Sequence, residues 1–204
     1  MKNQIVLDEA VRAIFEKNAG LICVNQGEGV QIPFNQGTIN IISDNPKEKS
    51  RKYEWLSLSR EYYCLFVLDN EIYNDGVFSI PKSISLEECT TSEIREEFKT
   101  LNHSNIEAIR KMPCIFAEKN KSPQTAMGNQ QAKVGRITNV VIQEDFIKFY
   151  FDIFLVFPQQ CINQNISLFN LKTASMRNEL DMEHWAIKLC DMIETLSKLN
   201  IDIQ

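Results

Sequence analysis

The chain has 204 residues, of which 44% are hydrophobic and 24% charged, and its formal net charge is −5. This length predicts a single domain over residues 1–204 and leaves open an N-terminal subregion at residues 1–43. The acidic balance argues against a nucleic-acid partner, which needs clustered Lys and Arg. No apolar run has the length of a membrane span and the first residues lack a signal-peptide pattern, so we expect neither.

The six cysteines are widely spaced, with no two closer than 25 residues. This spacing excludes a CxxC metal or redox pair and is typical of reduced thiols in a cytoplasmic protein. Cys64 and Cys114 lie inside apolar runs, which indicates small core residues.

The first third of the chain predicts a helix followed by turns. Apolar residues recur at helical spacing over residues 4–18, and Gly20 stands at the position of a C-terminal cap. Glycines then punctuate residues 20–37. Gly27-Glu28-Gly29 lacks the third glycine and the Lys-Ser/Thr end of a phosphate loop, so we interpret it as a turn. The charged residues 43–52 predict a solvated loop.

The middle third predicts strands and two short helices. YYCLFVL and VFSI, between Glu61 and Pro81, read as a strand pair joined by a turn at Asn74-Asp75-Gly76. Helices are predicted from capping boxes at Thr90/Glu93 and Ser104/Glu107, and a buried strand from Cys114 to Ala117. The polar stretch from Glu118 to Ala132 predicts a mobile surface loop.

The longest strand signal is Val134 to Phe157, which predicts a hairpin with its turn at residues 143–145. In its second arm, alternate residues from Ile147 to Ile153 are apolar, as a half-buried strand requires. The run from Phe154 to Phe157 is expected to be buried on both faces. Gly135 indicates a bulge or a close backbone approach.

The last segment predicts an amphipathic helix capped by Asp181. Its apolar stripe would contain Trp185, Leu189, Met192, Leu196 and Leu199. We expect this stripe to pack on the central hairpin.

No local motif for catalysis or metal binding is present. With only His103 and His184, a three-histidine site is excluded, and no signature supports a Cys–His nucleophile pair. Asp69, Glu71 and Asp75 match no calcium loop. We therefore expect no metal and no cofactor. Arg136 opens a strand in an apolar region, and an edge-strand arginine is the ordinary interpretation.

The order MPCIFAEKN, VGRITNVV, IKFYFDIF and HWAIKLCDM resembles a poorly characterised bacterial domain associated with effectors of conflict and phage-defence systems. In that pattern a Pro-x-Ile-Phe-Ala strand is followed by a Gly-x-Ile-Thr strand and a closing His-Trp-Ala-Ile-Lys segment. The resemblance covers Met112 to Met192 and implies a biological context without a reaction. Its matching polar positions are Arg136, His184 and Lys188, which we take as candidate ligand-binding residues.

Together these signals predict an α+β fold with a mainly antiparallel sheet, either open or curled into a partly open barrel, and flanking N-terminal, middle and C-terminal helices. For function we expect a non-enzymatic binding or regulatory module whose partner is a protein or a small-molecule ligand. The oligomeric state stays open. The alternative is an enzyme with dispersed site residues, either a metal-dependent nuclease using Asp69, Glu71 and Asp75 or a nucleotide-acting hydrolase.

Overall fold

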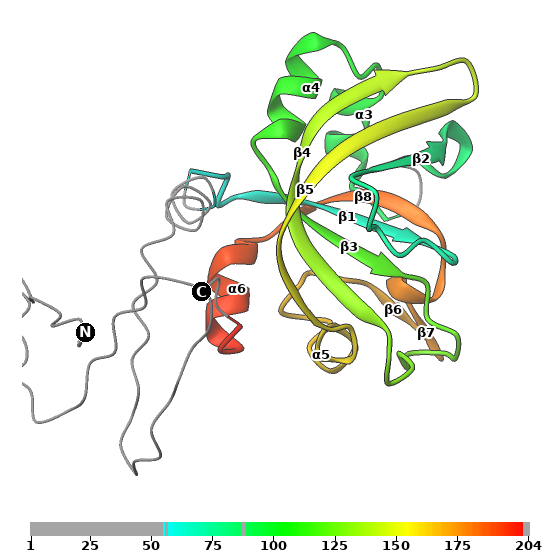
Figure 1. Cartoon of the computed structure of the whole chain (residues 1–204), viewed down its shortest axis with the longest axis vertical. Coiled ribbons are helices and arrows are strands. Elements are labelled where there is room, and N and C mark those ends of the chain that lie inside the picture. Colours follow the sequence, from blue (N-terminus) through cyan, green and yellow to red (C-terminus); the bar gives the residue numbers. More distant parts are fainter. Residues whose placement is uncertain (1–54, 56, 87–88, 202–204) are drawn as a thin grey trace, which may run out of the picture. The chain divides into compact units, whose positions relative to one another are not determined.

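The computed structural model describes residues 55, 57–86 and 89–201 (Figure 1). Contacts divide the chain into two units, residues 1–46 and 47–204, and all described residues belong to the second. The helix predicted at residues 4–18 and the loop at 43–52 lie outside the described residues. Within the described residues, no helix has the length and apolar character needed to cross a bilayer.

The described part combines six main strands with four short α-helices. The strands are β1 (Tyr62–Leu68), β2 (Val77–Pro81), β3 (Pro113–Glu118), β4 (Gln131–Ile142), β5 (Phe146–Pro158) and β8 (His184–Leu189). The α-helices are α3 (Ser92–Phe98), α4 (His103–Arg110), α5 (Gln160–Gln164) and α6 (Met192–Lys198). Two 3-10 turns, η1 (Lys82–Ile84) and η2 (Glu179–Asp181), and a small ribbon of β6 (Thr173–Ala174) and β7 (Arg177–Asn178) complete it.

The six main strands form one strongly curled sheet in the order β2-β5-β4-β3-β1-β8. Only β1 and β3 pair in parallel, and their connection contains α3 and α4; the other neighbours are antiparallel. The predicted α+β fold with a mainly antiparallel, partly open barrel is therefore confirmed. Figure 1 shows the long, bent β4 and β5 extending from the level of α4 to that of α5.

The predicted central hairpin is confirmed as β4 and β5. Its register shifts between Val134 and Gly135, so a bulge lies where the glycine predicted one. A Cβ on Gly135 would stand 1.9 Å from the carbonyl oxygen of Asp152, so the partner strand can approach this closely only at a glycine.

The sheet has an apolar core on each face. One core lies under α3 and α4 and is centred on Phe66, which stacks on Phe116 at 5.4 Å and on Trp185 at 5.7 Å. The other lies under α5 and α6 and contains Tyr63, whose hydroxyl donates to the carbonyl of Phe169 at 2.7 Å. Side chains alternate between the two cores along β1, which explains why almost the whole strand is buried.

Three predictions about local structure were wrong. β1 and β2 do not form a hairpin, because the doubly buried β1 is an inner strand that pairs with β3 and β8, while β2 pairs with β5. The bend at residues 75–76 directly precedes β2, but it is not the turn of a hairpin. Val156 is half exposed, so the end of β5 is not buried on both faces. The helices begin differently, since Asn102 rather than Ser104 caps α4, in a reciprocal pair with Asn105.

The predicted C-terminal helix is divided into β8 and α6. The spacing of Trp185 and Leu189 fits either structure, but here it belongs to an extended strand paired with β1. Leu189 is 53% exposed, whereas Leu196 on α6 is 1% exposed. The helix begins only after Asp191, whose side chain accepts from the backbone N–H of Glu194.

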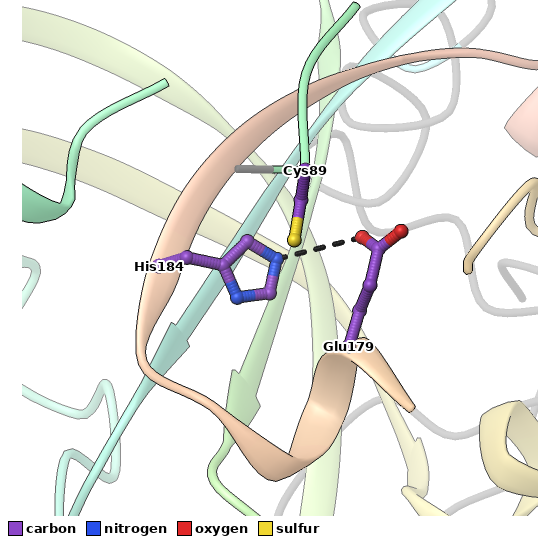
Figure 2. A group of neighbouring side chains, drawn as sticks. All are labelled: Cys89, Glu179 and His184. Atoms are coloured by element: carbon purple, nitrogen blue, oxygen red, sulfur yellow. Dashed lines mark ion pairs between the residues drawn. The ribbon is translucent and has the colours of Figure 1, made fainter. Parts of the chain in front are cut away.

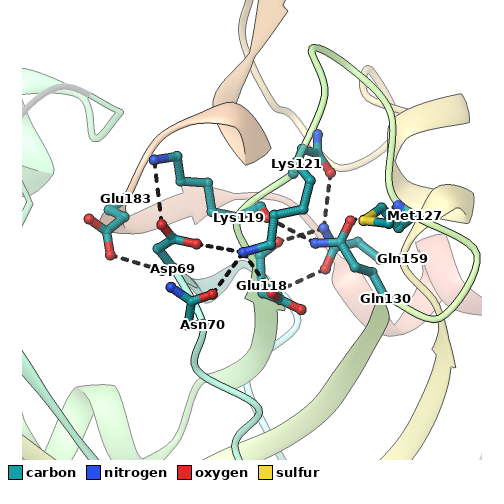
Figure 3. A network of polar contacts seen from close by, with 10 residues as sticks. Asp69, Asn70, Glu118, Lys119, Lys121, Met127, Gln130, Gln159 and Glu183 are labelled. Carbon is teal, nitrogen blue, oxygen red and sulfur yellow. Dashed lines mark hydrogen bonds and ion pairs between the residues drawn. The ribbon is translucent and has the colours of Figure 1, made fainter.

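Hydrogen bonds hold the connection between β3 and β4 in place (Figure 3). The side chain of Gln159 accepts from the N–H of Glu118 at 3.0 Å and donates to its carbonyl at 2.6 Å. Gln130 donates to the carbonyl of Lys119 and accepts from the N–H of Met127. The predicted loop is present at residues 119–130, and the bonds of Gln159 attach its start to the body of the fold, while its mobility stays a prediction.

Candidate functional site

Strand β8 presents two distinct features on its two faces. Two residues that precede α3 contact its outer edge: Leu86 donates its N–H to the carbonyl of Trp185, and the Thr90 hydroxyl accepts from the N–H of Ile187. Because side chains alternate along a strand, Trp185 enters the core under α3, whereas His184 and Lys188 face the opposite side.

On the Trp185 side lies a pocket of about 260 Å³ between η1, α3 and the tip of the β4–β5 hairpin. Its apolar wall is formed by buried side chains, including Phe98, Leu101 and Ile147. All charged residues among the described lining residues are basic: Lys82, Arg95 and Lys99. Lys99 also forms a surface ion pair with Glu96, one turn back on the helix. The lining therefore combines apolar and basic side chains.

Trp185 is a buried aromatic residue of this pocket's lining. Its ring is 1% exposed, stacks on Phe66 and meets Phe149 edge-on with centroids 5.0 Å apart. Its indole Nε1 is buried and has no hydrogen-bond partner among the described residues. A buried indole N–H ordinarily finds an acceptor, because leaving a buried donor unsatisfied costs about 1–3 kcal/mol.

On the opposite face, four buried polar residues form a cluster: Cys89, Glu179, His184 and Lys188, of which Figure 2 draws the first three. The Nζ of Lys188 lies 2.7 and 2.9 Å from the two carboxylate oxygens of Glu179 and donates to the carbonyl of Cys89 at 2.9 Å. The Nε2 of His184 lies 3.6 Å from Oε2 of Glu179, within ion-pair but beyond hydrogen-bond distance. The ligand atoms of Cys89, Glu179 and His184 all lie within 4.8 Å of one another.

Opposite charges in the cluster stabilise one another. Burial by itself lowers the pKa of His184, but the nearby Cys89 thiol and Glu179 carboxylate outweigh it and raise that pKa to about 9. Burial raises the pKa of Glu179, but His184 and Lys188 outweigh it and lower the pKa of that carboxyl. Glu179 is thus an anion held between two cationic side chains.

Glu179 is held in place by the structure of η2. Asn178 caps this turn in a reciprocal pair with Asp181, and Asp181 also accepts from the side chain of Asn120 at 2.8 Å. Oε1 of Glu179 accepts from the backbone N–H of Lys172 at 2.6 Å. These contacts fix the carboxylate beneath β8.

The three candidate ligand-binding residues do not form one site. His184 and Lys188 come together on β8, although His184 opens a strand instead of the predicted helix. Arg136 is on β4, with β3 and β1 between that strand and β8. It pairs with Asp152 at 3.3 Å and its guanidinium lies over the ring of Phe154. Their role in binding a ligand stays a prediction.

The acidic residues of the alternative nuclease hypothesis have other contacts. Asp69 pairs with Lys121 at 2.7 Å, and Glu71 accepts from the N–H of Tyr73. Lys121 holds the pKa of the Asp69 carboxyl below its usual value.

Cys89 and Glu179 were not anticipated as site residues. Cys89 stands alone in a polar segment, and Glu179 lies in a segment without a clear helix or strand pattern. Neither residue therefore belongs to a short sequence motif that would indicate a metal or binding site. They meet only because β8 returns beside β1 and brings η2 with it.

Comparison of the chain with protein-family models, with curated proteins and with solved structures finds no match.

Proposed function

We propose that the chain is a non-enzymatic binding module that takes a small organic anion in the pocket beside Trp185. The ligand class is a carboxylate or phosphate ester with a flat apolar portion. The observation that carries the proposal is the buried indole N–H of Trp185, which lacks an acceptor and belongs to a residue lining a pocket whose described charges are all basic.

Each part of the lining has a role in this proposal. The anionic oxygens accept from the indole N–H and from Arg95 or Lys82, since hydrogen bonds to charged groups contribute about 1.5–3 kcal/mol. The apolar portion packs against Phe98 and Ile147, both of which are buried. An apolar cavity with a few convergent polar groups is the common form of small-molecule sites.

The test is calorimetric titration of the full chain with phenyl phosphate and, as a probe of the anionic part alone, inorganic phosphate. We expect phenyl phosphate to bind, and Arg95→Gln to weaken it at least about tenfold, the loss of one charge-assisted hydrogen bond. Arg110→Gln is the matched control, because Arg110 is an exposed arginine on α4 that pairs with Glu107 outside the pocket. Equal affinity of wild type and of the Arg95→Gln, Lys82→Gln double variant would contradict the proposal.

The site also suggests how binding is communicated. Ser85 and Leu86 line the pocket, and the same segment reaches Cys89 and Thr90 against β8. We propose that ligand binding is communicated through these contacts with β8, as suits a regulatory module of the cytoplasm. A role in a bacterial defence system stays a prediction from the resemblance.

A further inference from the structure

We infer that Cys89, Glu179 and His184 form a binding site for one divalent zinc-like ion. The site lies on the face of β8 opposite the anion pocket and is independent of the proposed function. The ligand atoms are Sγ of Cys89, Oε2 of Glu179 and Nε2 of His184, all within 4.8 Å of one another.

The spacing suits tetrahedral coordination. Bonds of about 2.0–2.1 Å from zinc to nitrogen and oxygen place two ligand atoms roughly 3.4 Å apart. The Nε2 of His184 and Oε2 of Glu179 are 3.6 Å apart. Side-chain movements of a few tenths of an ångström therefore suffice for these two ligands.

The geometry of His184 points to the same conclusion. His184 is 4% exposed, and its Nε2 is buried without a hydrogen-bond partner among the described residues. The other ring nitrogen, Nδ1, lies 3.0 Å from the carbonyl oxygen of Met182. Metal-binding histidines ordinarily donate their second N–H to such a carbonyl, which directs the remaining nitrogen to the ion.

Glu179 has a corresponding outer support. Its Oε1 accepts from Lys188 at 2.7 Å and from the N–H of Lys172 at 2.6 Å, while Oε2 accepts from Lys188 at 2.9 Å and lies 3.6 Å from Nε2 of His184. Outer hydrogen bonds of this kind hold ligating carboxylates in orientation. The thiolate and the carboxylate together balance the charge of a divalent ion.

The donor set selects the ion. One thiolate, one imidazole and one carboxylate suit zinc, whereas magnesium and calcium prefer oxygen alone. Binding displaces the protons of Sγ and Nε2 to solvent. The three ligands come from separate segments, so the ion joins the segment before α3, η2 and β8. A water molecule or an added ligand would complete the fourth position.

The test is zinc binding by the full chain after its purification tag has been removed, measured by competition with a chromophoric chelator. We expect one zinc ion per chain. Cys89→Ser should weaken binding at least about 100-fold, beyond the 10–100-fold typical of outer-shell changes. Cys190→Ser is the matched control, because Cys190 is a half-buried free cysteine whose thiol donates to the carbonyl of Leu168. Unchanged affinity in Cys89→Ser, or no zinc uptake by wild type, would overturn the inference.

X-ray absorption spectroscopy of zinc-loaded wild type decides the matter even if Cys89→Ser does not fold. The inference predicts a single sulfur at about 2.3 Å together with nitrogen and oxygen ligands at about 2.0–2.2 Å. A shell with no sulfur, or with two or more, would contradict it. Failure of this site leaves the anion pocket standing, because the pocket is tested with a different ligand and different variants.

Discussion

The ammonium of Lys188 is bound by both carboxylate oxygens of Glu179, at 2.7 and 2.9 Å, while their side chains are only 4% and 3% exposed. A buried ion pair of this kind adds little net stability over an apolar pair, but removing one partner leaves an uncompensated charge in the interior. The pair also determines where Oε2 of Glu179 faces.

Glu179→Gln should therefore be among the most destabilising conservative changes in the chain. We expect the free energy of unfolding to fall by about 3–5 kcal/mol, measured by denaturant titration in the presence of a chelator. Glu194→Gln removes a carboxylate from an exposed pair with Lys198 and should cost at most about 1 kcal/mol. Similar costs for the two variants would contradict the buried ion pair.

Gly135→Ala should disrupt the β4–β5 hairpin. The added methyl group would stand 1.9 Å from the carbonyl oxygen of Asp152, and backbone atoms cannot move aside as a side chain can. We expect a loss of more than about 3 kcal/mol, above the 1–3 kcal/mol usual for overpacking. Gly128→Ala, where nothing lies within 4 Å, should change stability by less than about 1 kcal/mol. Thermal melts of both variants test the bulge.

Two leucines of the C-terminal segment should respond in opposite ways to truncation. Leu196→Ala empties a position that is 1% exposed and should cost about 2–5 kcal/mol. Leu189→Ala, at a position 53% exposed on β8, should cost less than about 1 kcal/mol. A larger loss of unfolding free energy for Leu189→Ala than for Leu196→Ala in denaturant melts would instead support a continuous helix with Leu189 on its buried face.

Gln159→Ala should loosen the connection between β3 and β4. Its fully buried amide satisfies both backbone groups of Glu118, and an unsatisfied buried group costs about 1–3 kcal/mol. We expect a loss in that range and faster proteolysis between residues 119 and 130. Gln143→Ala, at the exposed turn of the β4–β5 hairpin, is the control and should leave both quantities unchanged. Equal proteolysis of the two variants would contradict this role.

The sequence predicts those parts of the fold whose signal is local. The alternation after Phe146, the glycine at 135 and the turn at 143–145 together specify the hairpin, because each acts between neighbouring residues. The partner of β1 is not predictable in this way. Its apolar run shows that both faces are buried, but the choice of β3 and β8 over β2 depends on contacts far apart in the chain.

The same limit applies to the candidate site. His184 and Lys188 were selected by a resemblance, and their spacing of four residues fits a helix as well as a strand. In a strand this even spacing places both on one face, while Trp185 turns to the other. Glu179 and Cys89 join them only through tertiary folding, so no spacing rule could have identified them.

The most direct test of the proposed anion site is to follow the nuclear magnetic resonance signal of the Trp185 indole N–H. The chain has only two tryptophans, so Trp55→Phe assigns both indole signals. On titration with phenyl phosphate we predict that the Trp185 indole proton moves to lower field, as expected for a newly formed hydrogen bond to an anionic oxygen. The Trp55 signal should stay in place. A Trp185 signal that does not move up to the solubility limit of phenyl phosphate would contradict the proposed binding site.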